Sequence, residues 1–189
     1  ILSAMLISAS VFYASSKVSA ELAGVKSFTG SIGGNAAGTK AVQAGAATKG
    51  RIDFGTSSFL GSPNAPYVII DFSDFQCPFC KKFFDETKND VVKNLVDSGK
   101  ARFMYKHFPL DSIHPNARPA AIAFECAKVQ GKPWEFHDAL FANQNSLSNA
   151  LYSRLASSLG LDLTAFNSCS GNSAAANAVV ESDLQQGIA

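Results

Sequence analysis

Two of the four cysteines, Cys77 and Cys80, form a C-x-x-C motif, which is the strongest chemical signal in the sequence. A run of β-forming residues at 67–72 precedes the motif, and a helical pattern follows it. The first sulfur is therefore expected at a helix N-terminus, where partial positive charge favours thiolate over thiol. Pro78 suits the first helical turn, because that turn needs no N–H from it. Cys80 lies one turn further in, so the motif predicts dithiol–disulfide exchange through a mixed disulfide at Cys77, resolved by Cys80.

A zinc half-site and a static disulfide are the structural alternatives for this motif. Zinc would need two further ligands, usually a second C-x-x-C or paired histidines. The three histidines, His107, His114 and His137, are isolated from one another, and the other two cysteines stand singly. We therefore expect neither a metal nor an organic cofactor, and we expect the histidines to cap helices or form local hydrogen bonds.

The charge balance gives little support to nucleic-acid binding. The chain has 16 Lys and Arg against 15 Asp and Glu, a net charge of +1, and no basic stripe. Hydrophobic residues make up 47% of the sequence, which is enough to fill a core. Four cysteines are too few for a miniprotein held together by disulfides.

The first 50 residues differ in composition from the rest. Residues 1–16 are uncharged and mostly apolar, so residues 1–20 are interpreted as a membrane anchor or a signal segment, with a buried helix as the alternative. Residues 21–50 are rich in Gly, Ala, Ser and Thr without periodicity, as in a flexible linker. An anchor or a signal would place the remainder outside the cytoplasm, where disulfides persist.

Regular structure is expected from about residue 51 onward. The patterns predict a buried strand at 67–72, a helix from Pro78 to Gly99 and a second strand at 101–108. Only helices follow Asn116, with Ser148 and Asp162 as candidate N-caps. A parallel sheet should resume after such a crossover. We therefore expect the sequence to stop inside a domain.

The stretch at 72–80, Phe-Ser-Asp-Phe-Gln-Cys-Pro-Phe-Cys, resembles the active site of DsbA-like proteins. The resemblance continues at residues 60–66, 105–110, 114–117, 125–127 and 130–138, and spans roughly residues 51–189. It implies an α/β thioredoxin fold with an inserted all-helical domain at about 112–186. The family's cis-proline loop, last strands and last helix would lie beyond Ala189.

The resemblance also implies an activity. DsbA-like proteins exchange disulfides with unfolded or partly folded exported proteins that carry cysteines, and we expect this chain to act as an oxidase that a membrane redox partner reoxidises. Phe79 stands where the best-known oxidising members have His, which implies a milder oxidant. The alternatives are a reductase or isomerase kept reduced by a membrane donor, and a peptide-binding or chaperone module.

The resemblance also implies roles for two further pairs of residues. Asp71 and Lys106 resemble the buried acid and nearby lysine that move protons to the second cysteine, with an ordinary salt bridge or solvent-facing charges as the alternative. Cys126 and Cys169 resemble the structural disulfide that some subfamilies carry in the helical insertion, with two buried free thiols as the alternative.

Three phenylalanines near the motif, Phe75, Phe79 and Phe84, are candidates for an apolar rim that binds unfolded chains. Aromatic side chains this close to a strand and a helix are more often part of the core. We therefore expect exposure only for Phe79, which lies between the cysteines.

Overall fold

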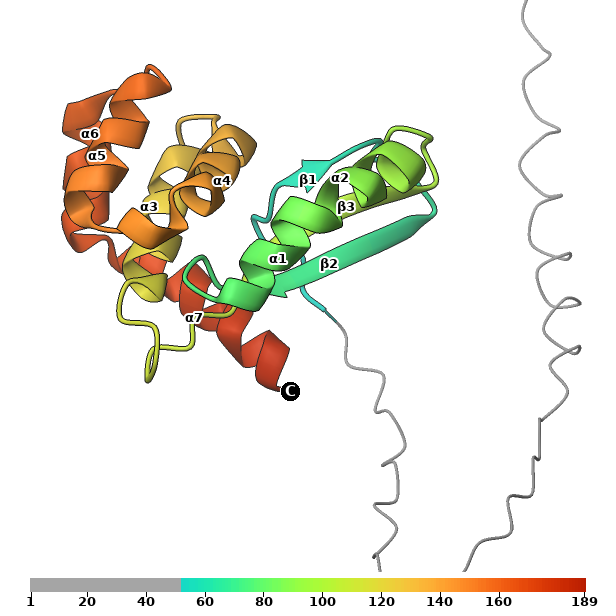
Figure 1. The fold of residues 1–189 in the computed structure, drawn as a ribbon, viewed down its shortest axis with the longest axis horizontal. Helices are drawn as coiled ribbons and strands as arrows, with labels where there is room; N and C mark the ends of the chain where they lie inside the picture. The colour runs from blue at the N-terminus through green and yellow to red at the C-terminus, as the bar shows by residue number, and fades with distance from the viewer. Residues whose placement is uncertain (1–51) are drawn as a thin grey trace, which may run out of the picture. The chain divides into compact units, whose positions relative to one another are not determined.

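A computed structural model describes residues 52–189, in which helices cover a small mixed β-sheet. The strands are β1 (Phe59–Leu60), β2 (Tyr67–Ser73) and β3 (Ala101–His107). The helices are α1 (Pro78–Glu86), α2 (Lys88–Val91), the π-helical turn η2 (Val92–Val96), α3 (Ala117–Lys128), α4 (Pro133–Ala142), the 3₁₀ turn η3 (Gln144–Ser146), α5 (Asn149–Ser158), α6 (Leu163–Asn172) and α7 (Ala174–Ile188) (Figure 1). The anchor or signal and the linker expected at residues 1–20 and 21–50 lie outside the described residues.

The described strands form a sheet in the order β1-β3-β2. β2 and β3 are parallel, and β1 is a short antiparallel strand at the other edge of β3. Parallel neighbours need a crossover, which α1, α2 and η2 supply. The prediction of one helix from Pro78 to Gly99 is wrong, because Thr87 leaves helical geometry (φ −125°, ψ −39°) and separates α1 from α2.

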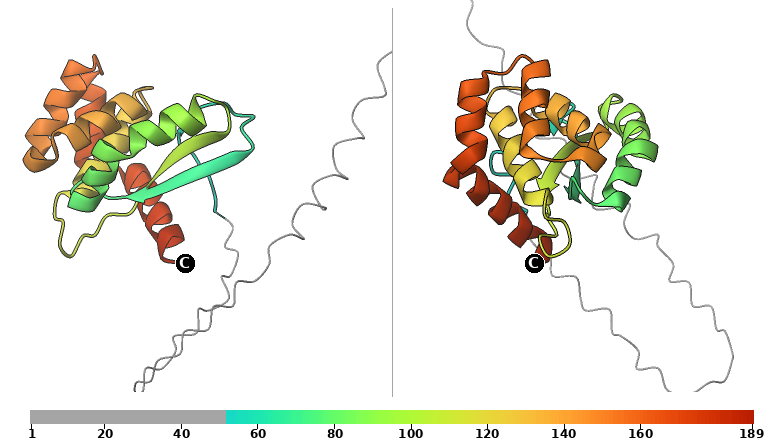
Figure 2. Two further views of the ribbon diagram at one scale, coloured as in Figure 1. Left: turned by 45° about the vertical axis from the view of Figure 1, so that its right-hand side comes forward. Right: turned by 60° about the vertical axis from the view of Figure 1, so that its left-hand side comes forward.

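Different helices cover the two faces of the sheet. Phe83 of α1 stacks over Phe103 of β3, with ring centroids 6.5 Å apart. Lys106, on the other face of β3, forms an ion pair with Asp183 of α7. In Figure 2, α1 and α2 lie on one side of the strands and α7 passes on the other. The motif and its surroundings therefore belong to the α1 face.

The helices after β3 begin and end where local signals place them. The side chains of Ser148 and Asp162 accept hydrogen bonds from backbone N–H groups three residues later, which confirms both predicted N-caps. Ser173 caps α7 in the same way. Gly131 and Gly160 follow α3 and α5 with φ of +79° and +72°, a conformation that glycine adopts at little cost. No helix within residues 52–189 is both long and apolar enough to cross a membrane.

A hydrophobic cluster of buried residues lies among the helices after β3 and extends to the loop before α1. Phe75, in that loop, is 1% exposed and stacks on Tyr105 of β3 with a centroid separation of 4.9 Å. It also contacts Phe141 of α4 and Phe124 of α3. Burial of this aromatic group fixes the loop between the sheet and the helical insertion, which positions the residue that starts α1.

Candidate redox-active site

Cys77 occupies the N-cap position of α1, as the sequence predicts. Its backbone is extended (φ −73°, ψ 125°), and Pro78 is the first helical residue. The Cys77 N–H donates to the Asp74 carbonyl at 3.1 Å, and its carbonyl accepts from the Lys81 N–H at 3.0 Å. Cys77 and Cys80 are both unbonded and partly exposed. The first sulfur therefore lies at the helix end where N–H groups lack intrahelical partners.

Cys80 lies one turn further along α1 and packs against the hydrophobic cluster. Burial raises the pKa of Cys80 to about 11, and the neighbouring Cys77 adds to the rise. The nearby Ser73 side chain and Asp74 backbone, which can donate hydrogen bonds to a charged sulfur, act in the opposite direction. Cys80 is therefore a neutral thiol near pH 7, and its participation in exchange requires proton transfer.

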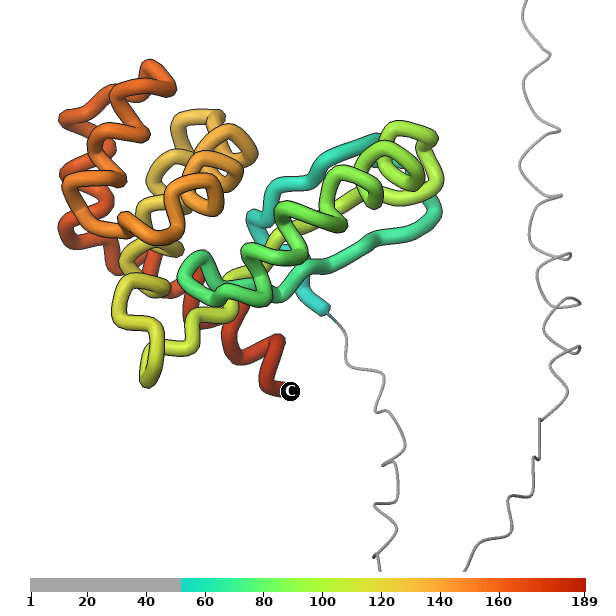
Figure 3. Tube along the Cα trace, viewed as in Figure 1, coloured from blue at the N-terminus to red at the C-terminus, as the bar shows by residue number. Residues whose placement is uncertain are grey.

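The Asp74 carboxylate connects the loop before Cys77 to the segment between β3 and α3. The buried side chain accepts from the Gln76 N–H (2.7 Å), the Leu110 N–H (2.9 Å) and His114 Nδ1 (2.8 Å). In Figure 3 the loop before α1 runs beside this segment. The sequence analysis missed Asp74, because its partners are 36 and 40 residues away and no local pattern marks them.

Gln144 in η3 contributes a second connection to the same loop. Its amide nitrogen donates to the Phe75 carbonyl at 2.9 Å and to the Cys77 carbonyl at 3.0 Å. Gln76 is held in turn through its side-chain oxygen, which accepts from the Asn116 N–H at 2.7 Å. The loop around Cys77 is thus anchored to the helical insertion by the Gln144 side chain and by the Asn116 backbone N–H.

The expectation that Lys106 lies beside Asp71 is wrong. In the parallel register Asp71 is opposite Tyr105, whereas Lys106 is opposite Phe72, so the two charged side chains point to opposite faces of the sheet. The Lys106 Nζ lies 2.6 Å from Asp183 Oδ1, and both residues are buried. Lys106 therefore takes part in an ordinary ion pair, which was the alternative interpretation.

Asp71 remains on the face that carries the motif, with a different cation nearby. Burial raises the pKa of Asp71 to about 6, and attraction to Lys88 of α2 opposes the rise. Lys88 is 5% exposed, and its Nζ lies 2.5 Å from Asp138 Oδ1 of α4. The sequence analysis missed Lys88, because its partners Asp71 and Asp138 are distant in the sequence.

The three candidate rim phenylalanines occupy different environments. Phe79 is 80% exposed, as expected for the residue between the cysteines. Phe75 is fully buried, and Phe84 is partly buried and stacks on Phe141 at 5.1 Å. Of these three residues, Phe79 alone is well exposed beside the sulfurs.

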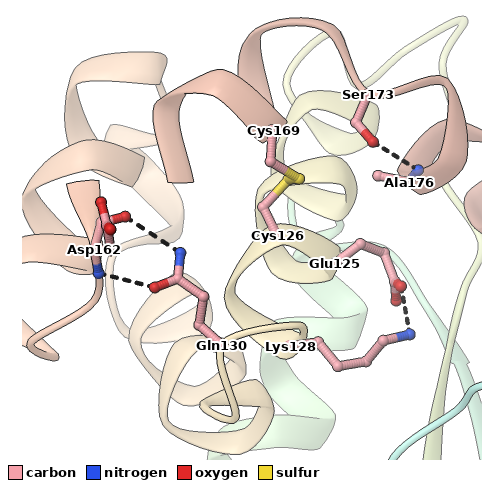
Figure 4. The surroundings of a disulfide bond; sticks show 8 residues. All are labelled: Glu125, Cys126, Lys128, Gln130, Asp162, Cys169, Ser173 and Ala176. Carbon is pink, nitrogen blue, oxygen red and sulfur yellow. Dashed lines mark hydrogen bonds and ion pairs between the residues drawn. A yellow bond between two sulfur atoms is a disulfide. The ribbon is translucent and has the colours of Figure 1, made fainter. Parts of the chain in front are cut away.

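Cys126 of α3 and Cys169 of α6 form a disulfide in the structure. Figure 4 shows the bond beside two hydrogen bonds between Gln130 and Asp162, which join the end of α3 to the start of α6. The disulfide lies in the helical insertion. It leaves Cys77 and Cys80 as the pair available for exchange.

Sequence comparison relates the chain to parts of longer proteins. A profile of the thioredoxin family matches residues 53–187. The Na⁺/H⁺ antiporter NhaA 3 of Salinispora tropica is 40% identical over 106 residues, which are 56% of this chain and 16% of the antiporter. Disulfide bond formation protein D of Bacillus subtilis is 28% identical over 107 residues, which are 56% of this chain and 47% of that protein. The chain thus spans less than half of either relative.

Structural comparison covers more of the chain. The crystal structure of α-DsbA1 from Wolbachia pipientis matches with a TM-score of 0.62 and 26% identity, over 70% of this chain and 68% of that protein. The match supports the arrangement expected from the sequence, a thioredoxin fold with a helical insertion. The chain therefore belongs to the thioredoxin family, and its fold is that of the DsbA-like proteins within it.

Proposed function

We propose that this chain is a thiol–disulfide oxidoreductase that exchanges its Cys77–Cys80 pair with cysteines of other proteins. The observation that carries the proposal is the difference between the two sulfurs. Cys77 caps the N-terminus of α1, whereas burial raises the pKa of Cys80 to about 11. One sulfur is placed to react with a substrate, and the other is placed to react second.

In the oxidising direction, a substrate thiolate attacks the Cys77 sulfur of the disulfide form. A bond forms between the substrate sulfur and Cys77, and the Cys77–Cys80 bond breaks with its electron pair on Cys80. A second substrate thiolate then attacks the first substrate sulfur and releases Cys77. The substrate dithiol loses two electrons, and the Cys77–Cys80 pair gains them.

Asp71 is the group that exchanges a proton with Cys80 in this proposal. Its pKa of about 6 makes it mostly ionised at neutral pH, so it accepts a proton from the Cys80 thiol in one direction and returns it in the other. Lys88, rather than Lys106, is the cation that acts on Asp71.

The proposed substrates are unfolded or partly folded exported proteins, and the proposed direction is their oxidation. The exposed ring of Phe79 offers an apolar contact for such chains. The Cys126–Cys169 disulfide is typical of a protein outside the cytoplasm. A membrane redox partner would then accept the electrons, and the reaction as written requires no metal or organic cofactor.

The test is the equilibrium reduction potential of the Cys77–Cys80 pair, measured against glutathione. We expect a value well above the roughly −270 mV of thioredoxin. A value near or below that figure would instead indicate a reductase kept reduced by a membrane donor.

Two single variants test the order of reaction of the cysteines. Cys80→Ser should accumulate a mixed disulfide with a cysteine-containing peptide, because nothing resolves it, and the matched Cys77→Ser variant should accumulate none. If neither variant forms one while peptide binding persists, the cysteines are incidental to a peptide-binding module.

A further inference from the structure

Ser73 carries a buried hydroxyl that lacks a hydrogen-bond partner. The residue is 2% exposed, and its Oγ has no partner of ordinary geometry among the described residues. Its backbone is firmly held, since the Ser73 carbonyl accepts from the Phe108 N–H at 2.8 Å and from the Tyr105 hydroxyl at 3.0 Å. Native structures leave few buried polar groups unsatisfied, so this hydroxyl requires an acceptor.

The Cys80 sulfur is an acceptor within reach of this hydroxyl. Ser73 ends β2 on the face that α1 covers, and Cys80, like Phe84, is an α1 residue that packs inward there. Burial raises the pKa of Cys80 to about 11, and hydrogen bonding from the Ser73 side chain and the Asp74 backbone favours the charged sulfur. A neutral thiol is a weak acceptor, whereas a thiolate is a strong one.

We propose that the Ser73 hydroxyl is a catalytic hydrogen-bond donor to the Cys80 thiolate. While Cys80 is a neutral thiol, the hydroxyl has no partner of ordinary geometry. This role rests on the exchange function proposed above. When a thiolate attacks Cys77, the Cys77–Cys80 bond breaks and its electron pair remains on Cys80. Ser73 donates a hydrogen bond to that charge and keeps its own proton, while Asp71 supplies the proton that later neutralises Cys80. An interaction made only with the charged sulfur accelerates the step.

Other ionisable groups face the same position and bear on the assignment. Asp71 lies two residues earlier on β2, and Cys77 lies at the start of α1. Tyr105 of β3 already uses its hydroxyl on the Ser73 carbonyl. His107 is opposite Ser73 in the register, and its Nδ1 also lacks a partner, so this nitrogen is the competing acceptor for the hydroxyl.

The first experiment measures the thiolate fraction of Cys80 directly and requires no exchange activity. In the full chain carrying Cys77→Ala, the alkylation rate of Cys80 at a fixed alkaline pH reports that fraction. Loss of one hydrogen bond to a charged group should make Ser73→Ala react about tenfold more slowly. Ser73→Thr keeps a hydroxyl and should react at nearly the unmodified rate. Ser73→Val, which matches Thr in shape, should react slowly.

The second experiment follows the reaction of the oxidised full chain with glutathione, whose attack on Cys77 expels Cys80. Ser73→Ala should slow this step about tenfold, and Ser73→Thr should restore it. The unfolding midpoint of Ser73→Ala should not fall, because no hydrogen bond of the resting state is lost.

The outcomes separate this proposal from the function on which it rests. An unmodified chain that does not react with glutathione would refute the exchange function, and the alkylation assay would still decide the role of Ser73. Equal rates for Ser73→Ala and the unmodified chain in both assays would overturn the proposal and leave His107 as the partner. If Ser73→Ala does not fold, the comparison of Ser73→Thr with Ser73→Val decides whether the hydroxyl acts on Cys80.

Discussion

Replacing Asp71 by Asn tests the electrostatic cost of placing this carboxylate on β2. Burial raises the pKa of Asp71 from its ordinary 3.8 to about 6, while Lys88 opposes the rise. The folded state holds the Asp71 proton more tightly than the unfolded chain does. Stability is therefore lost as the pH rises between these two pKa values, and it stays lower above them. The difference between the two pKa values corresponds to about 3 kcal/mol. The side chain is partly exposed, so screening reduces the expected cost to about 1–2 kcal/mol.

Asp71→Asn should therefore be more stable than the unmodified chain by about 1–2 kcal/mol at neutral pH, and the two should converge below about pH 4. Urea unfolding at a series of pH values measures this difference. Asp97→Asn makes the same chemical change at an exposed position and serves as the matched control. A stability difference between Asp71→Asn and the unmodified chain that does not vary with pH would refute the reasoning.

The same variant should exchange disulfides more slowly. Cys80, with its pKa of about 11, would lose the base that accepts its proton, and loss of such a group slows a step by at least about a hundredfold in typical cases. The rate at which the reduced chain is oxidised by glutathione disulfide, followed as a function of pH, gives the test. If Asp71→Asn left both the rate and its pH profile unchanged, the proton-transfer role would be wrong even if the stability prediction held.

Three further predictions concern residues around the site. Replacing Cys126 and Cys169 together by Ala should lower the free energy of unfolding by about 4 kcal/mol, because the bond closes a loop with a sequence separation of 43, and unchanged urea unfolding would contradict this. Lys106→Met should cost about 3–5 kcal/mol by leaving Asp183 charged and unpaired, and adding Asp183→Leu should recover most of that in the same assay. Failure of the double variant to recover would show that the ion pair is not the cause. Phe79→His should raise the reduction potential by roughly 30 mV or more, since it stabilises the reduced form, and an unchanged or lower potential against glutathione would show that this position does not tune the pair.

The local parts of the structure could be predicted from the sequence. The C-x-x-C motif between a strand and a helix, and the N-caps Ser148 and Asp162, depend on residues within a few positions of each other. A side chain that accepts from an N–H three residues later needs no tertiary partner to do so. The order of strand, helix, strand and further helices followed from the same local patterns, and the resemblance of the motif indicated the thioredoxin fold.

The partners of the charged side chains near the site were decided by tertiary structure alone. A strand pattern shows that Asp71 and Lys106 lie on β2 and β3. The register of these strands directs Lys106 to the face where it meets Asp183. Lys88, which follows the break at Thr87, is the cation that acts on Asp71. Pairing across a sheet depends on alignment, and a shift of one residue reverses every side chain. The sequence by itself therefore identified the two cysteines for which exchange is proposed, because their position at a strand–helix junction is set locally. Only the folded chain decided which groups surround those sulfurs, because these groups come from segments that packing brings together.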